Sequence, residues 1–403
     1  MRRFGLSSLF TLVALAGPVA VAHAQQAEPT TRQGVIEQAQ AEKARDLRPY
    51  TPSRGERLAS RIQGVITGEG KHAHPFFESA YPGGGFAFGA GYARYVSAYN
   101  FIDARASYST ANYKRAEIEF VAPRLFHRRG ELSLLGGWRD ATEVDFFGFG
   151  INSSKDNQTN YRFQRPYASA LLTLRPTRRF LTLRGGLEWT TWSQEPGLGR
   201  TPSVEQVFTP VTLPGLGADP TYLHTQATVG FDWRTSAGYS RRGGFYGVTA
   251  HDFSDRDKAF GFQQVEYEAI QHVPLLREAW VLSFRARAMT TLDKSNQTMP
   301  FFMLPSLGGS STLRGYTSLR FRDRSSLLLQ GEWRIIANRY LDSAVFYDAG
   351  TVAARKSDLD LDKMKHDYGF GVRFHGPNFT PLRLELARGS EGLVLVVATS
   401  AVF

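Results

Sequence analysis

From His74 to the C-terminus, hydrophobic and polar residues alternate with a period of two. Clear examples are the segments 102–108, 115–120, 264–269, 282–288 and 382–386. Strict alternation over such lengths predicts β-strands with one apolar face and one polar face. A water-soluble sandwich buries the apolar face, whereas a barrel in lipid turns that face outward. Alternation alone does not separate these two folds, so strand length and loop length have to decide.

The alternating runs predict about sixteen strands, many of them close to the length that crosses a tilted bilayer path. The expected strands are 74–81, 86–96, 100–109, 113–124, 130–140, 160–175, 180–193, 223–235, 243–254, 261–273, 279–292, 323–337, 341–351, 366–376, 380–389 and 392–403.

The connections between these strands alternate in length. Short connections follow even-numbered strands, at 97–100, 176–179, 275–278 and 338–340. Long connections follow odd-numbered strands, at 140–160, 194–222, 293–322 and 352–365. Short turns on the periplasmic side and long loops outside are expected of a barrel with both ends in the periplasm. The sequence therefore predicts an all-β fold, in which residues 74–403 form a sixteen-stranded antiparallel transmembrane β-barrel of the outer membrane.

Residues 1–24 have the features of a secretory signal peptide. Arg2 and Arg3 supply a positive start, residues 6–21 are mostly apolar, and 22–24 form an A-x-A cleavage site. The alternative is an N-terminal membrane anchor, which the short apolar run and the cleavage site disfavour. The expected location is therefore the cell outer membrane, reached through a cleaved signal peptide.

Residues 25–73 differ from the rest of the chain because they are polar and charged, with helical character near 34–47. They are expected to form a periplasmic segment with a short helix, or a helix that enters the barrel lumen. After residue 24 there is no run of about 18 apolar residues, so the sequence predicts no transmembrane helix.

The composition narrows the class of function further. The 403 residues include no cysteine, which excludes a disulfide framework and a thiolate metal site. The net charge of +11 would be compatible with a nucleic-acid partner. However, the arginines are spread through the alternating strands, and the export signal also argues against nucleic acid. Aromatic residues at 13% and 39 glycines fit the interfacial girdles and curved strands of a barrel.

A denser set of motifs lies between Leu304 and Gly350. Leu313-Arg314-Gly315-Tyr316 is followed by Gln330-Gly331-Glu332-Trp333-Arg334 and then by Phe346-Tyr347-Asp348-Ala349-Gly350. By alternation, Glu332 and Asp348 point into the lumen if the neighbouring leucines face lipid. Two facing carboxylates need a cation between them, and a guanidinium suits this role best. On spacing alone, Arg314 could equally be an exposed loop charge.

The order and spacing of these motifs resemble the bacterial surface antigen family, which is the BamA/TamA and two-partner-secretion transporter superfamily. The resemblance implies a sixteen-stranded barrel whose sixth external loop folds back into the lumen. It implies that Arg314, Gly315 and Tyr316 form the tip of that loop. Glu332 and Asp348 would be the lumen partners of the tip, and Phe346 and Gly350 belong to the strand motif.

The resemblance covers residues 74–403, and it includes the stretch from Phe146 to Ser154, which looks like a loop segment of short members. Residues 25–73 are too short for the periplasmic POTRA domains that larger relatives carry. A complete insertase or secretion function is therefore less well supported than the barrel itself.

The C-terminal strand ends on Phe403. Barrels of this class present such a terminal aromatic to their assembly machinery, although a plain core strand would also fit. The expected partners are outer-membrane lipids including lipopolysaccharide, the barrel assembly machinery during biogenesis, and a polypeptide substrate or a separate periplasmic partner. No nucleic-acid partner is expected.

No other constellation supports a catalytic or metal site. His72 and His74 lack further ligands nearby, and the alternating Asp358, Asp360 and Asp362 lack the glycine and glutamate of a calcium loop. The glycines at 83–85 predict a tight turn, and no Gly-x-Ser-x-Gly motif occurs. No cofactor, no metal and no enzymatic activity are expected.

The predicted function is outer-membrane protein assembly, polypeptide translocation or lipid handling. It would use a weak seam between the first and last strands and a loop that gates the lumen. A passive porin-like channel is the main alternative, because a sixteen-stranded barrel is wide enough for water. An outer-membrane enzyme is a weaker third hypothesis.

Overall fold

The computed structural model describes residues 31–46, 72–177, 180–376 and 378–403. The chain divides into two compact units, Met1–Leu58 and Ala59–Phe403. In the first unit, helix α1 (Arg32–Asp46) covers most of the predicted helical stretch. No helix in the described ranges is both long and apolar enough to span a membrane. The expected signal peptide lies outside the described residues, so it stays a prediction, as do the domain boundaries.

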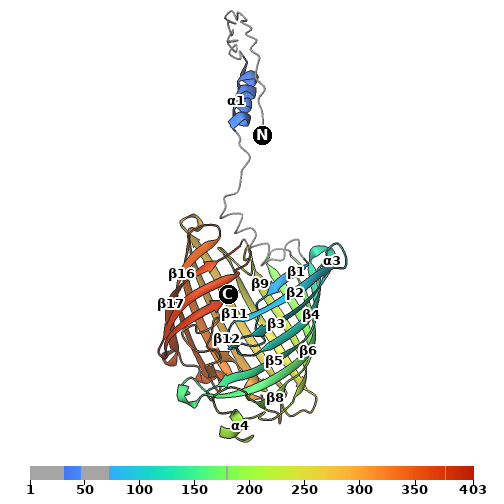
Figure 1. The fold of residues 1–403 in the computed structure, drawn as a ribbon, viewed down its shortest axis with the longest axis vertical. Coiled ribbons are helices and arrows are strands. Elements are labelled where there is room, and N and C mark those ends of the chain that lie inside the picture. The colour runs from blue at the N-terminus through green and yellow to red at the C-terminus, as the bar shows by residue number, and fades with distance from the viewer. Residues whose placement is uncertain (1–30, 47–71, 178–179, 377) are drawn as a thin grey trace, which may run out of the picture. The chain divides into compact units, whose positions relative to one another are not determined.

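The second unit is a wall of antiparallel strands (Figure 1). Within the described residues, sixteen strands follow one another around this wall, which confirms the predicted number. They are β1 (Ala73–Phe76), β2 (Ala87–Tyr95), β3 (Phe101–Ser109), β4 (Lys114–Arg124), β5 (Gly130–Phe146), β6 (Thr159–Leu174), β7 (Leu181–Thr191), β9 (Thr221–Asp232), β10 (Gly243–Asp255), β11 (Phe262–Leu275), β12 (Trp280–Asp293), β15 (Ser325–Ile336), β16 (Leu341–Ala353), β17 (Lys365–Phe374), β18 (Leu382–Gly389) and β19 (Gly392–Ala398).

The remaining elements are short and lie in the connections. Strand β8 (Ser193–Pro196) pairs with β6 beyond the end of β7, and β13 (Ser306–Leu307) pairs with β14 (Phe321–Arg322). The short helices are α3 (Leu125–Arg128), α4 (Val204–Val207), η1 (Lys155–Asn157), η2 (Leu276–Glu278), η3 (Phe301–Met303), η4 (Lys356–Asp358) and η5 (Leu361–Lys363). The short turns, including α3, lie at one rim, and the long loops with α4 lie at the opposite end (Figure 1).

The alternation places apolar side chains outside and ion pairs inside. On β12, Phe284 is 51% exposed on the outer face, whereas its neighbour Arg285 donates to Glu268 of β11 inside the lumen. The adjacent Arg287 pairs with Glu266 in the same way. This arrangement is the one expected in lipid and the reverse of a soluble sandwich.

The two strands that border the seam are shorter than predicted. The first strand, expected over 74–81, ends at Phe76. The chain then turns inward, because Glu78 accepts a hydrogen bond from Ser107 of β3 and Tyr81 packs edge-on against Phe163 at 4.8 Å. These inward contacts take the place of further pairing with β2.

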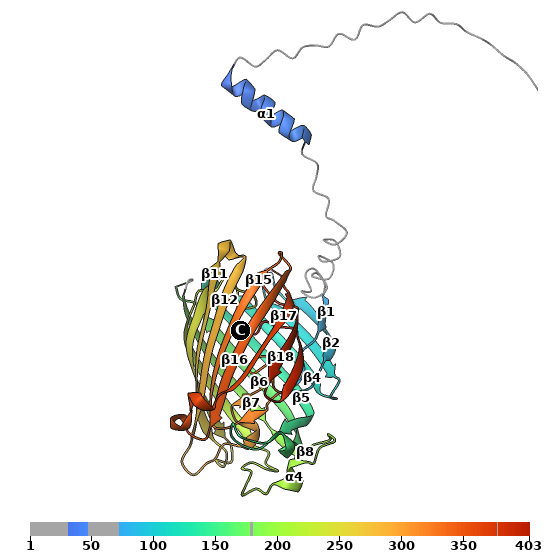
Figure 2. The same cartoon turned by 90° about the vertical axis from the view of Figure 1, so that its left-hand side faces the viewer.

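The last strand, expected to run to residue 403, ends at Ala398. The final residues leave the sheet because the Ser400 carbonyl accepts a 2.9 Å hydrogen bond from Arg383, and the Phe403 ring stacks on His272 at 6.0 Å. Among the described residues, no strand register joins β19 to β1. Figure 2 shows the red strands of the C-terminal end near the blue strands that begin the wall.

Candidate functional site

The sixth external connection, residues 294–324, is called loop 6 here and links β12 to β15. Gly308 and Gly309 have φ values of +112° and +104°, a backbone region that other residues rarely adopt. At Gly308 a Cβ would also lie 2.2 Å from the Thr317 carbonyl oxygen. These two glycines therefore allow the loop to reverse sharply and present the tip, residues 313–316, to the inner wall.

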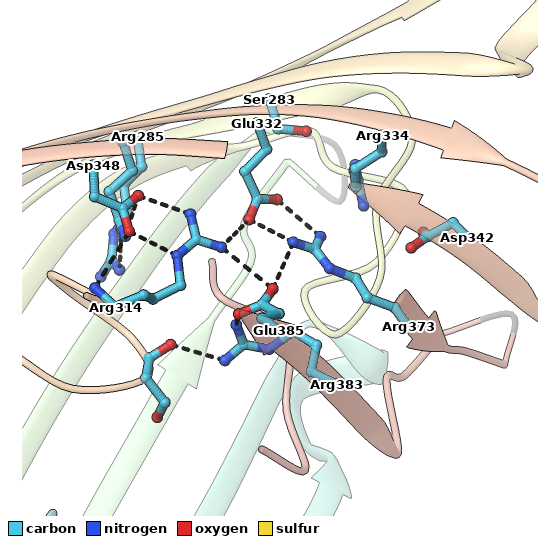
Figure 3. A network of polar contacts seen from close by, with 12 residues as sticks. Ser283, Arg285, Arg314, Glu332, Arg334, Asp342, Asp348, Arg373, Arg383 and Glu385 are labelled. Carbon is cyan, nitrogen blue, oxygen red and sulfur yellow. Dashed lines mark hydrogen bonds and ion pairs between the residues drawn. The ribbon is translucent and has the colours of Figure 1, made fainter. Parts of the chain in front are cut away.

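The Arg314 side chain lies between two carboxylates of the wall (Figure 3). Its Nε donates to Asp348 Oδ2 at 2.7 Å, and its Nη2 donates to Asp348 Oδ1 at 2.7 Å. Its Nη1 donates to Glu332 Oε1 at 2.6 Å. The contact with Asp348 is bidentate, which is the geometry that only a guanidinium offers. The structure thus brings together three residues that the sequence singled out.

The wall completes the environment of Arg314. The guanidinium carbon stands 3.5 Å from the centre of the Phe346 ring, so the strand motif residue supplies a cation–π contact. Gln330 donates to Asp348 Oδ1 at 3.2 Å and to the Thr312 carbonyl at 2.8 Å. The strand register explains the contact with Asp348, because Gln330 lies opposite that residue.

Three further charged residues extend the network, and the motifs did not identify them. Arg373 of β17 donates to Glu332 Oε2 at 2.8 Å and to Glu385 Oε1 at 3.1 Å. Arg383 donates to Glu385 Oε2 at 2.5 Å and to the Ser310 carbonyl of loop 6 at 2.9 Å. The alternation in segment 382–386 already pointed Arg383 and Glu385 inward. Only the fold shows that they meet the loop.

The network is buried and balanced in charge. It consists of three arginines, at 314, 373 and 383, and three carboxylates, at 332, 348 and 385. The side chains of Arg314, Asp348 and Glu385 are all 0% exposed. Burial alone would lower the pKa of Arg314. The charges of Asp348 and Glu332 outweigh it and hold that pKa above the ordinary value for arginine. The guanidinium therefore stays charged at any pH at which the barrel is folded.

Gly315 and Tyr316 fix the tip against β17 and β18. A Cβ at Gly315 would lie 2.5 Å from Asp367 Cβ and 2.6 Å from the backbone nitrogen of Gly389. Close approach of the loop to these two strands therefore accounts for the glycine. The Tyr316 hydroxyl contacts the His366 carbonyl at 3.1 Å and Ser390 Oγ at 3.1 Å.

Apolar packing supports the polar anchor. Leu307, Leu313 and Tyr316 of loop 6 form a buried cluster with residues of the wall and of the third external loop. A Cβ at Gly350 would lie 2.8 Å from Leu307 Cδ1, so the second strand motif residue leaves room for the loop.

The stretch 146–154 contacts the second half of loop 6. Arg320 donates to the Ser153 carbonyl at 2.7 Å and to Glu391 Oε1 at 2.9 Å. Arg322 donates to the Tyr161 hydroxyl at 2.7 Å. The stretch was recognised from sequence as a family feature, and its partner in the fold is loop 6.

Buried aromatic side chains gather at the external end of the barrel. This external cluster draws on loops and strand ends from across the chain. Its largest members are Tyr113, Phe146, Tyr161, Phe163, Trp192, Tyr222, Phe262, Phe301 and Phe302.

The opposite end is crossed by the turn between β9 and β10, residues 233–242, which is called the periplasmic strap here. The Tyr239 ring stacks on His375 at 3.9 Å, and its hydroxyl donates to Asp342 Oδ2 at 3.0 Å. Thr380 donates to the Gly238 carbonyl at 3.2 Å, and Arg334 donates to the Ser240 carbonyl. The strap therefore links β9 and β10 to the far strands β15 to β18.

Acid should loosen the periplasmic strap. Burial, together with nearby arginines, lowers the pKa of His375 to about 4, against an ordinary value of about 6.5. A depressed histidine pKa favours the closed strap above about pH 6.5, and this contribution is lost as the pH falls toward 4. Amide hydrogen exchange across 233–242 should become at least about tenfold faster at pH 4.5 than at pH 7, after correction for intrinsic rates.

His375→Phe keeps a ring against Tyr239 but cannot be protonated, so its corrected exchange should change much less between the two pH values. Equal corrected exchange at both pH values in the unsubstituted protein would contradict the expected effect.

The other residues noted from the sequence do not gather into a site. His74 contacts Asp103 at 2.8 Å, and His72 contacts the Ala93 carbonyl at 2.9 Å. Asp360 pairs with Lys363 at 3.0 Å in an exposed loop. Within the described ranges, no three histidine, aspartate or glutamate side chains are placed to hold a metal ion.

Sixteen antiparallel strands, an apolar exterior and an inserted external loop define a transmembrane β-barrel of the outer-membrane type. Residues 100–390 match the Omp85 superfamily domain, which is more than half of the chain. The chain therefore belongs to the Omp85 superfamily, whose members are transporters and assembly factors rather than enzymes.

Solved structures support the same fold. BamA from Haemophilus ducreyi lacking POTRA domains 1–3 aligns with a TM-score of 0.57 at 14% identity, over 81% of this chain and 68% of that one. CdiB from Escherichia coli aligns with a TM-score of 0.54 at 11% identity, over 81% and 60%. CdiB from Acinetobacter baumannii aligns with a TM-score of 0.52 at 10% identity, over 78% of this chain and 57% of that one.

At these identities the likeness extends to the fold alone, and the chain spans less than two thirds of either CdiB chain. No curated protein sequence matches the chain.

Proposed function

We propose that this barrel handles polypeptides at the outer membrane, in protein assembly or translocation, and that the seam between β1 and β19 is where it does so. The observation that carries the proposal is the contrast between the seam and the lumen. The lumen is occupied by loop 6 and bordered by the external cluster and the periplasmic strap. The strands at the seam are only four and seven residues long.

Unpaired strand edges have a specific chemistry in a membrane. Backbone N–H and C=O groups that face hydrocarbon without partners cost several kcal/mol each. An incoming strand would satisfy these groups by adding to the sheet edge. The exposed edge of β19 and the part of β2 beyond β1 supply such groups. Polypeptide is therefore favoured over lipid as the substrate, because only a polypeptide can extend the ladder of hydrogen bonds.

Loop 6 is proposed to gate the lumen, with Arg314, Glu332 and Asp348 as its anchor. The occupied lumen weighs against the passive channel, which needs a continuous aqueous path. We also propose that a separate periplasmic partner delivers the substrate, and that the assembly machinery uses the strand ending at Phe403 to insert this barrel. Lipopolysaccharide is proposed as a surrounding lipid.

Photo-crosslinking in living cells tests the seam directly. A photoreactive phenylalanine analogue would replace Leu395 of β19, which is 70% exposed on the outer face. The matched control would replace Val248 of β10, which is 41% exposed on the outer face of another part of the wall. Polypeptide adducts should form at position 395 and not at 248. Equal adduct patterns at both positions, or only lipid adducts at 395, would reject polypeptide handling at the seam.

A further inference from the structure

The short turns of the barrel carry an unbalanced charge. In the turns at this rim, the described residues include eight arginines and one carboxylate, Glu278. The arginines are Arg128, Arg129, Arg175, Arg234, Arg241, Arg242, Arg277 and Arg339. The external loops differ, since the loop 354–364 carries three basic and three acidic residues. The turns at this rim therefore carry a strongly positive net charge.

Two neighbouring turns bring three of these arginines together. The backbone N–H of Arg175 donates to the Arg129 carbonyl at 2.7 Å, which joins the turn after β6 to the turn after β4. Arg128, Arg129 and Arg175 are all exposed. No described carboxylate lies within ion-pair distance of these three guanidinium groups. Exposed arginines on two joined turns, without a described carboxylate partner, attract anions.

The same turns also expose apolar side chains. Phe126 is 61% exposed beside Arg128, and Leu276 is 64% exposed beside Arg277. Both turns hold three successive non-glycine residues at positive φ, over 126–128 and 276–278. This backbone is unfavourable for L-residues, so the two turns share a costly geometry that displays an apolar group next to a cation.

The exposed arginines and the apolar side chains beside them together indicate which kind of partner binds this rim. An apolar side chain at the end of lipid-facing strands lies at the boundary of the hydrocarbon, where aromatic groups and snorkelling arginines meet head groups. Arg124 shows this mode, with its guanidinium carbon 3.6 Å from the centre of the exposed Tyr99 ring. A soluble acidic protein would account for the arginines but not for the apolar groups beside them.

We infer that this rim binds the phosphate head groups of anionic phospholipids in the inner leaflet of the outer membrane. Its centre is Arg128, Arg129 and Arg175, and Arg277 contributes from a further turn. Guanidinium groups bind phosphate oxygens in a bidentate manner. The inference does not depend on the proposed polypeptide substrate at the seam, because it concerns the lipids that surround the barrel.

The test is lipid selectivity of the full chain in bilayers. The purified protein would be reconstituted in phosphatidylcholine, and spin-labelled phosphatidylglycerol and phosphatidylcholine would report which lipid contacts it. The unsubstituted protein should prefer phosphatidylglycerol by about threefold or more. The variant R128Q/R129Q/R175Q/R277Q should lose most of this preference.

A matched variant separates local binding from total charge. R200Q/R256Q/K258Q/K356Q removes the same formal charge from exposed external positions, and it should keep the preference. Folding of every variant would be verified by heat-modifiable migration in gels. Equal binding of both lipids by the unsubstituted protein would overturn the inference and favour a soluble acidic partner. An equal loss in both variants would also overturn it.

Discussion

Replacing Arg314 with alanine should lower the free energy of unfolding by about 3–5 kcal/mol and raise the ion conductance of the barrel. Among the described residues, the substitution removes the guanidinium that pairs with Asp348 and one of the two that pair with Glu332, and both carboxylate side chains are at most 2% exposed. Loop 6 also loses its bidentate anchor. Relief of the uncompensated charge then requires water to enter or the loop to leave the lumen, and either change opens a path for ions.

Urea titration followed by tryptophan fluorescence gives the change in stability, and planar-bilayer recording gives the conductance. The matched control is Arg287→Ala. Arg287 is another lumen arginine with a carboxylate partner at 2.6 Å, but its side chain is 32% exposed. Arg287→Ala should lower the free energy of unfolding much less than Arg314→Ala does, and it should leave the conductance low. A wild-type barrel that is already steadily open, and is indifferent to Arg314→Ala, would refute the gating role of loop 6.

Gly315→Ala should displace the loop tip without removing any charge. The new Cβ would approach Asp367 Cβ and the Gly389 backbone nitrogen to within 2.6 Å, and neither belongs to a flexible side-chain end. Overpacking of this kind typically costs about 1–3 kcal/mol. The tip must therefore retreat from β17 and β18, which also pulls Arg314 away from Asp348.

The measurements are the same unfolding titration and conductance recording. Gly185→Ala is the control, because a Cβ there meets nothing within 4 Å. Conductance should rise for Gly315→Ala and stay unchanged for Gly185→Ala. If both variants match the unsubstituted protein, the close approach of the tip to the wall is not needed for closure.

The strands of the barrel wall could be predicted because each one depends on residues that are close together in the sequence. Alternation along a strand assigns each side chain to one face, and Glu332 and Asp348 were placed in the lumen on that basis alone. The structure puts both beside Arg314. Turn lengths are also local properties, and they gave the correct order of short and long connections.

The rest of the site depends on contacts between distant residues. Glu385 lies 71 residues from Arg314 in sequence, and alternation says only that it points inward. The inward turn after Phe76 and the departure of the chain after Ala398 depend on partners such as Phe163 and Arg383. The strap was missed because Tyr239 meets His375 and Asp342 across the periplasmic mouth. No pattern within one segment could reveal these pairings.

The position of Arg373, Arg383 and Glu385 near the end of the chain has a consequence for the order of biogenesis. Loop 6 is synthesised before the strands that complete its anchor, so its arginine has no full set of counter-ions until the C-terminal strands arrive. Docking of the loop is therefore a late event, coupled to formation of the final hairpin. A chain that stalls before β18 would carry an unanchored loop, and this species would be open to degradation before its wall was complete.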